Sequence, residues 1–163
     1  MGLFNFFKRT RTENEQLHGF ISNPQGISFE EAKQLRESFL AIAEQDDESA
    51  AFNAASDLML SRAFSECIQA YKQLSEKYPN RQGDCYSQIG AAYYFLEDYE
   101  QAIRFYVLAR DSGADEDMMD DNIWEACETI YRKKNNKSAI EKYKELCPNG
   151  NYLKQANKLL SSN

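Results

Sequence analysis

The chain has 163 residues, 42% of them hydrophobic and 28% charged, with a formal net charge of −7. A chain of this length can bury the core of one domain, and its acidity argues against nucleic acid as a partner. Ten Tyr, ten Phe and only three Pro exclude general disorder and favour an all-helical fold.

The N-terminal residues combine aromatic and basic side chains. Phe4, Phe6 and Phe7 precede Lys8 and Arg9, a pattern that a short interfacial membrane anchor would show. A tail that packs on the end of the domain or stays mobile is the favoured interpretation. Residues 13–21 predict a weak helix and 22–26 a loop. We therefore assign residues 1–27 to an N-terminal tail with a weak helix, and 28–163 to a helical domain.

A stronger helix begins after residue 28. Ser28 and Glu31 have the spacing of a capping box, in which each side chain bonds the other residue's backbone. Apolar residues at helical spacing, including Leu35 and Phe39, predict a helix to about residue 45. We expect this helix to cover the open end of the elements that follow.

Three pairs of amphipathic helices are predicted next, over about 48–81, 83–116 and 120–153. In the central pair, Gly90 and Ala102 are small enough for two helices to cross closely, with Tyr106 filling the space around them. Phe64 and Tyr99 open the second helices of the first two pairs. Residues 151–162 predict a closing helix whose outer face carries lysines.

The central stretch resembles the tetratricopeptide repeat. The residues that carry the resemblance are Tyr86, Ile89, Gly90, Tyr93, Ala102, Tyr106 and Ala109. Ala114 stands where the family has its terminal Pro. The resemblance implies an α-α superhelix of about three repeats, which needs neighbouring repeats and polar caps to bury its apolar faces.

In this family, the first helix of each repeat lines a concave groove that binds a partner protein. Carried over by position, the resemblance implies a partner-binding groove formed by Phe52, Met59, Tyr94, Phe95, Trp124, Glu128, Tyr131 and Arg132. Such an apolar groove suits a peptide or a helix of another protein. The alternative is that the N-terminal segment of the same chain fills it.

Six acidic residues crowd the stretch 111–121. We expect a solvated loop in which one Asp caps the next helix, although the stretch could also receive a basic partner. It does not match a calcium-binding loop, because the turn Gly and the final Glu are absent.

Nothing in the sequence predicts catalysis, a cofactor or a metal site. His18 is the single histidine, the glycines are isolated, and the four cysteines lack metal-site spacing. The cysteine pattern and the absence of a secretory signal favour a reducing compartment, the cytoplasm. We therefore predict a non-enzymatic protein-binding module. The alternatives are an immunity-type protein that neutralises a basic toxin and an assembly factor tethered to a membrane by residues 1–11.

Overall fold

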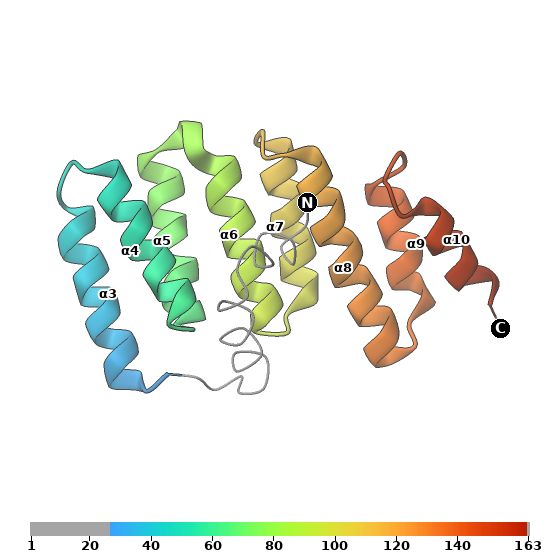
Figure 1. Cartoon of the computed structure of the whole chain (residues 1–163), viewed down its shortest axis with the longest axis horizontal. Coiled ribbons are helices and arrows are strands. Elements are labelled where there is room, and N and C mark those ends of the chain that lie inside the picture. The colour runs from blue at the N-terminus through green and yellow to red at the C-terminus, as the bar shows by residue number, and fades with distance from the viewer. Residues whose placement is uncertain (1–26, 163) are drawn as a thin grey trace, which may run out of the picture.

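In a computed structural model, which describes residues 27–162, the chain forms eight α-helices and one short 3-10 helix. The described residues contain no strand, which confirms the all-helical prediction. Figure 1 shows the helices following one another along the long axis, with α3 at one end and α10 at the other. The elements are α3 (Phe29–Ala43), α4 (Glu48–Leu60), α5 (Phe64–Lys77), η1 (Pro79–Arg81), α6 (Gln82–Phe95), α7 (Tyr99–Asp111), α8 (Glu116–Lys134), α9 (Lys137–Leu146) and α10 (Leu153–Ser161).

Side-chain caps explain where several helices begin. Ser28 and Glu31 form the predicted capping box at the start of α3. Asp47 accepts a hydrogen bond from the backbone N–H of Ala50 at 2.9 Å, and Asp115 caps α8 in the same way. The predicted Asp cap is therefore present. The predicted acidic loop is wrong for residues 116–121, because α8 already begins at Glu116.

Three turns between paired helices share one backbone geometry. Arg62, Glu97 and Asn135 each have a positive φ, of 66°, 61° and 49°. The first two turns also close with equivalent hydrogen bonds, which satisfy carbonyls at the helix ends. These bonds run from Ala63 N to Leu58 O at 2.9 Å and from Asp98 N to Tyr93 O at 3.0 Å. The pairs α4–α5 and α6–α7 therefore turn in the same way, and the α8–α9 turn shares with them a residue of positive φ.

Helices α6 and α7 cross closely at Gly90, as the sequence predicts. A Cβ atom on Gly90 would lie 2.6 Å from the ring of Tyr106 and 3.3 Å from the carbonyl oxygen of Ala102. Tyr106 is itself fully buried. Glycine is therefore required at this position by the close approach of the two helices.

The core runs through the whole stack. One group of buried side chains joins α3 to α6 and a second joins α7 to α10, and Tyr86 and Tyr93 pack against both. At the far end, α10 buries Ala156 and exposes Lys154 and Lys158. The expected polar outer face of the closing helix is therefore confirmed.

Candidate partner-binding surface

The predicted groove residues on α4 do not form an open site. Phe52 is half-buried and packs edge-on against Tyr71, with ring centroids 6.2 Å apart. The guanidinium of Arg81 lies 4.5 Å from the centroid of the Phe52 ring. Met59 is only 8% exposed, because its face of α4 also carries buried Ala55 and packs into the core. The expectation that Met59 lines an open groove is therefore wrong.

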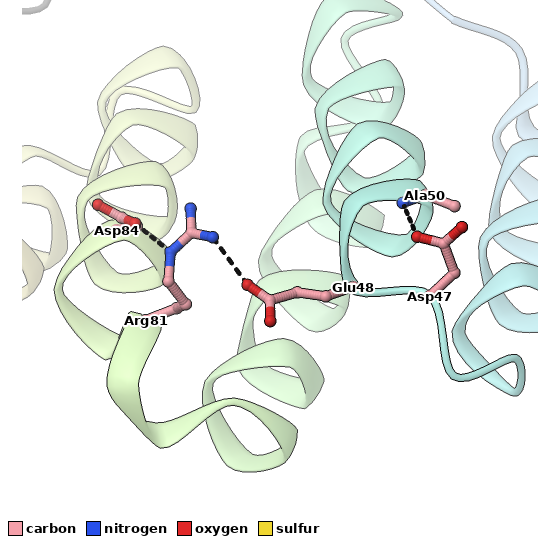
Figure 2. Close-up of polar contacts among 5 residues, drawn as sticks. All are labelled: Asp47, Glu48, Ala50, Arg81 and Asp84. Atoms are coloured by element: carbon pink, nitrogen blue, oxygen red, sulfur yellow. Dashed lines mark hydrogen bonds and ion pairs between the residues drawn. The ribbon is translucent and has the colours of Figure 1, made fainter.

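Arg81 joins the beginnings of α4 and α6 (Figure 2). Its Nη1 donates to Oε1 of Glu48 at 2.8 Å, and its Nε donates to Oδ2 of Asp84 at 2.6 Å. The Phe52 ring and the carboxylates of Glu48 and Asp84 together fix the position of the guanidinium. Phe52 thus belongs to a structural contact between neighbouring pairs of helices.

Tyr94 and Phe95 lie half-buried at the end of α6. Their rings meet edge-on with centroids 6.2 Å apart, and Phe95 stacks on Phe64 at 5.3 Å. The hydroxyl of Tyr94 hydrogen-bonds with that of Thr129 on α8 at 3.2 Å. Burial raises the pKa of Tyr94 to about 12, so its hydroxyl stays protonated at neutral pH.

Trp124 is placed in the interior, contrary to its predicted role as an open anchor. It is 4% exposed and stacks flat on Tyr152, with ring centroids 5.1 Å apart and planes 2° from parallel. Tyr143 meets it edge-on at 4.9 Å. The residues just before α10 cover the face of α8 that the sequence leaves open.

The other predicted groove residues of α8 follow Trp124 toward the C-terminal end of the helix. Glu128 accepts hydrogen bonds from Arg132 at 3.0 Å and from Gln155 of α10 at 3.1 Å. Tyr131 is half-buried, whereas the Arg132 side chain is 71% exposed. Of the eight predicted residues, Tyr94 reaches α8 through Thr129, and Glu128 and Arg132 pair with each other one turn apart on α8.

We define the α6–α8 surface as Tyr94, Phe95, Leu96, Tyr131 and Arg132. Besides the Tyr94–Thr129 contact, Lys133 of α8 pairs with Glu97 at 2.9 Å. These two contacts hold the end of α6 against the last turns of α8. Leu96 lies in the chain between Tyr94 and Glu97, and its side chain is 45% exposed. Sequence reasoning did not select this residue. The sequence signal that could have identified Leu96 is a large apolar side chain at the end of a helix, where packing does not require one.

A cleft lies elsewhere, between the start of α8 and the α9–α10 loop, and has a volume of about 620 Å³. We call it the acidic cleft. Its charged lining consists of Arg110, Glu116, Asp117, Asp120 and Glu145. Four carboxylates against one guanidinium make it suited to a cationic side chain.

Asp120 organises the wall of this cleft. One carboxylate oxygen accepts the hydroxyl of Tyr143 at 2.8 Å, and the other accepts the backbone N–H of Asn151 at 2.7 Å. A Cβ atom on Gly150 would collide with both Asp120 and Tyr143. Sequence reasoning missed this network, although Asp120 lies on the same helical face as buried Ile123 and Cys127.

Between residues 27 and 162, no group of three or more His, Cys, Asp or Glu side chains is arranged to hold a metal ion. All four cysteines are buried free thiols, and burial raises the pKa of Cys67, Cys127 and Cys147 to about 12. These thiols are therefore protonated at neutral pH and poor nucleophiles.

Several predicted features lie outside the described residues: the segment 1–11 with its aromatic and basic side chains, the weak helix over 13–21 with His18, and the loop over 22–26. Within the described part of the chain, no helix has the length and apolarity needed to cross a membrane. Comparison with family models, with curated proteins and with solved structures gives no match to this chain.

Proposed function

We propose that this protein is a non-enzymatic binding module that holds a peptide or helix of another protein on the α6–α8 surface. The observation that carries the proposal is the exposure of Leu96, next to half-buried Tyr94 and Phe95 at the end of α6, and of Arg132, next to half-buried Tyr131 near the end of α8. Aromatic side chains and Arg are the residues that most often anchor protein interfaces. Exposed apolar area next to a charged rim fits the same use.

We further propose that the helical stack is a tetratricopeptide-like superhelix. Its support is the positive φ shared by Arg62, Glu97 and Asn135 in the turns between paired helices, together with the close crossing at Gly90. Stacked helical pairs of this type offer long surfaces to partners. The buried free thiols fit a reducing compartment, and we propose the cytoplasm.

The acidic cleft supports a second candidate function. An immunity-type protein neutralises a basic toxin by covering it, and the four carboxylates of the cleft would receive Lys or Arg side chains. In this case, binding would weaken when Asp117 and Glu145 are replaced by Asn and Gln, and it would fall with rising salt. The membrane-tethered alternative depends on residues 1–11, outside the described part of the chain.

The test is an affinity capture from the native host's lysate with matched baits. Leu96→Lys with Arg132→Glu alters the α6–α8 surface without entering the core. Leu108→Lys on α7 is the control, because Leu108 is as exposed as Leu96, at 45%. A protein held by the wild type and by Leu108→Lys, but lost by the α6–α8 variant, supports the proposed surface.

Two other results would contradict it. If Asp117→Asn with Glu145→Gln loses the captured protein and the α6–α8 variant keeps it, the acidic cleft is the binding site. If every bait captures the same proteins, neither surface is used. Circular dichroism of each bait before capture establishes that lost binding is not lost folding.

A further inference from the structure

The start of α3, the α4–α5 turn and the α6–α7 turn all lie along the lower edge of the stack in Figure 1. Ile27, the first described residue, and Ser61 of the α4–α5 turn line one cleft of about 500 Å³. The residues that precede Ile27 in the chain therefore join the described helices at this edge.

Two large apolar side chains of this edge are exposed. Leu60, at the end of α4, is 56% exposed, and Leu96, just after α6, is 45% exposed. Phe64, which follows the first turn, stacks on Phe95, which precedes the second, with ring centroids 5.3 Å apart. The aromatic stack thus joins the two turns, and the leucines beside it suit an apolar ligand. We define the turn edge as Asp57, Leu60, Phe64, Phe95 and Leu96.

The charge of the turn edge favours a cationic ligand. Asp57 is exposed in the last turn of α4, and its carboxylate makes no ion pair with any other described residue. The last turns of α4 and α6 contain no basic residue, although the C-terminal end of a helix favours positive charge. Arg62, in the α4–α5 turn, lies over the Phe64 ring, 6.0 Å from its centroid. A cation beside Asp57 would therefore be stabilised by both the carboxylate and the helix end.

The sequence before Ile27 contains a segment with this chemistry, outside the described residues. Residues 4–7 include three Phe, and Lys8 and Arg9 follow them directly. The chain from residue 7 to Ile27 is about 20 residues long and can extend to roughly 70 Å. Neighbouring packed helices lie about 8–10 Å apart, so the end of α6, three helices along from α3, is within reach.

We infer that residues 4–9 dock on the turn edge of the same chain, with their Phe rings on the two exposed leucines and their cations beside Asp57. Removing this apolar area from water favours the docked state. The inference goes beyond the proposed function, because the ligand is a segment of this chain. The turn edge and the α6–α8 surface share Phe95 and Leu96, so the docked segment limits the access of a partner to that surface.

A photo-cross-link in the purified full-length protein tests the inference. Phe6→p-benzoylphenylalanine keeps an aromatic side chain in the segment and, on irradiation, bonds covalently to residues in contact with it. Proteolysis and mass spectrometry should then locate cross-links within one chain, at residues 57–64 and 95–97.

Matched leucine variants show whether the apolar contact holds the segment. Leu60→Lys with Leu96→Lys should lower the yield of these cross-links at least about fivefold, because the apolar contact is lost. Leu108→Lys on α7 replaces a leucine that is as exposed as Leu96, at 45%, and should leave the yield unchanged. Circular dichroism of each variant establishes that it is folded.

A charge exchange tests the contact with Asp57. Asp57→Lys should lower the cross-link yield, because it repels the two cations of the segment. Lys8→Glu with Arg9→Glu in the same Asp57→Lys chain should restore it, and added salt should weaken both effects. Damage to the fold by Asp57→Lys would not be reversed by changes in the N-terminal segment.

The inference would be overturned by an absence of cross-links, by cross-links confined to other residues, or by a yield that the double leucine variant leaves unchanged. Cross-links that join two chains would also overturn it, because they assign the turn edge to the segment of a second copy. No partner is present in this experiment. Cross-links at the turn edge together with a failed lysate capture would count against the proposed function alone, and the converse against this inference alone.

Discussion

The guanidinium of Arg81 and the carboxylate of Glu48 join two helices whose first residues lie far apart in the sequence, with 2.8 Å between Nη1 and Oε1. Arg81 also lies over Phe52, so it links two neighbouring pairs of helices through charge and through ring contact. The pair is partly exposed, with side chains 39% and 40% accessible, so solvent weakens its attraction.

The first prediction concerns this pair. Arg81→Ala should lower the free energy of unfolding by about 1–2 kcal/mol, since it removes the ion pair and the cation–π contact together. Glu48→Gln should cost less, because the contact with Phe52 remains. A double-mutant cycle measured by urea unfolding should give a coupling of about 0.5–1 kcal/mol. A coupling of zero would mean that Arg81 stabilises the fold through the Phe52 ring and Asp84 and not through Glu48.

The second prediction concerns the crossing of α6 and α7. Gly90→Leu should cost about 1–3 kcal/mol by overpacking, because the added side chain meets the buried ring of Tyr106. Thermal unfolding monitored by circular dichroism measures the loss. In a Tyr106→Leu background the same substitution should cost less, since the ring is gone. An unchanged melting temperature in the wild-type background would contradict the close crossing.

The third prediction concerns Trp124. Because it is enclosed by Tyr152 and Tyr143, Trp124→Ala should cost about 3–5 kcal/mol, the range for large buried aromatic residues. Trp124→Phe keeps a ring and should cost less. Denaturant unfolding of both variants provides the comparison. If Trp124→Ala loses less than about 1 kcal/mol, the tryptophan is an exposed residue, as the sequence alone suggested.

Local patterns predicted the elements of this fold well. Helices α5 and α7 begin at Phe64 and Tyr99 as expected, because the periodicity of apolar residues is a property of each helix itself. The close approach at Gly90 was also predictable, since a small residue stands amid large ones on a buried face. The capping box of Ser28 is a signal contained in four residues.

The candidate site was harder to predict, because exposure depends on what a distant segment covers. Whether Trp124 is open or buried is decided by the residues beside α10, which no local pattern on α8 can reveal. The contact between Arg81 and Glu48 is similarly invisible in either segment alone. The burial of Asp120 could have been predicted, because this residue lies on an apolar face of its helix. The neighbouring acidic residues obscured that signal.

The fourth prediction concerns the turn between α8 and α9. Asn135 has a φ of 49°, a conformation that Gly adopts freely, that Asn tolerates and that Ala avoids. Asn135→Ala should therefore lower stability by about 1 kcal/mol, whereas Asn135→Gly should be neutral or slightly stabilising. Urea unfolding of the two variants measures the difference. The reverse order would show that the left-handed conformation is not kept in solution.

The last prediction concerns the buried thiols at alkaline pH. Burial raises the pKa of Cys67 from 9.0 to about 12, because the thiolate cannot be solvated in the core. The unfolded chain can release this proton at lower pH than the folded chain. The stabilisation by the protonated thiol is therefore complete below pH 9 and is lost as the pH rises from 9 toward 12.

Cys67→Ala isolates this effect, since the variant has no proton to release at that position. The wild type should be the more stable protein at pH 7 to 8, because Cys67 fills its site completely. Its advantage over Cys67→Ala should shrink by roughly 1 kcal/mol per pH unit above pH 9. Urea unfolding of both proteins from pH 7 to 10.5 measures the gap. A gap that stays constant over this range would mean that water reaches the thiol, and that the core between α4 and α6 opens more readily than its packing indicates.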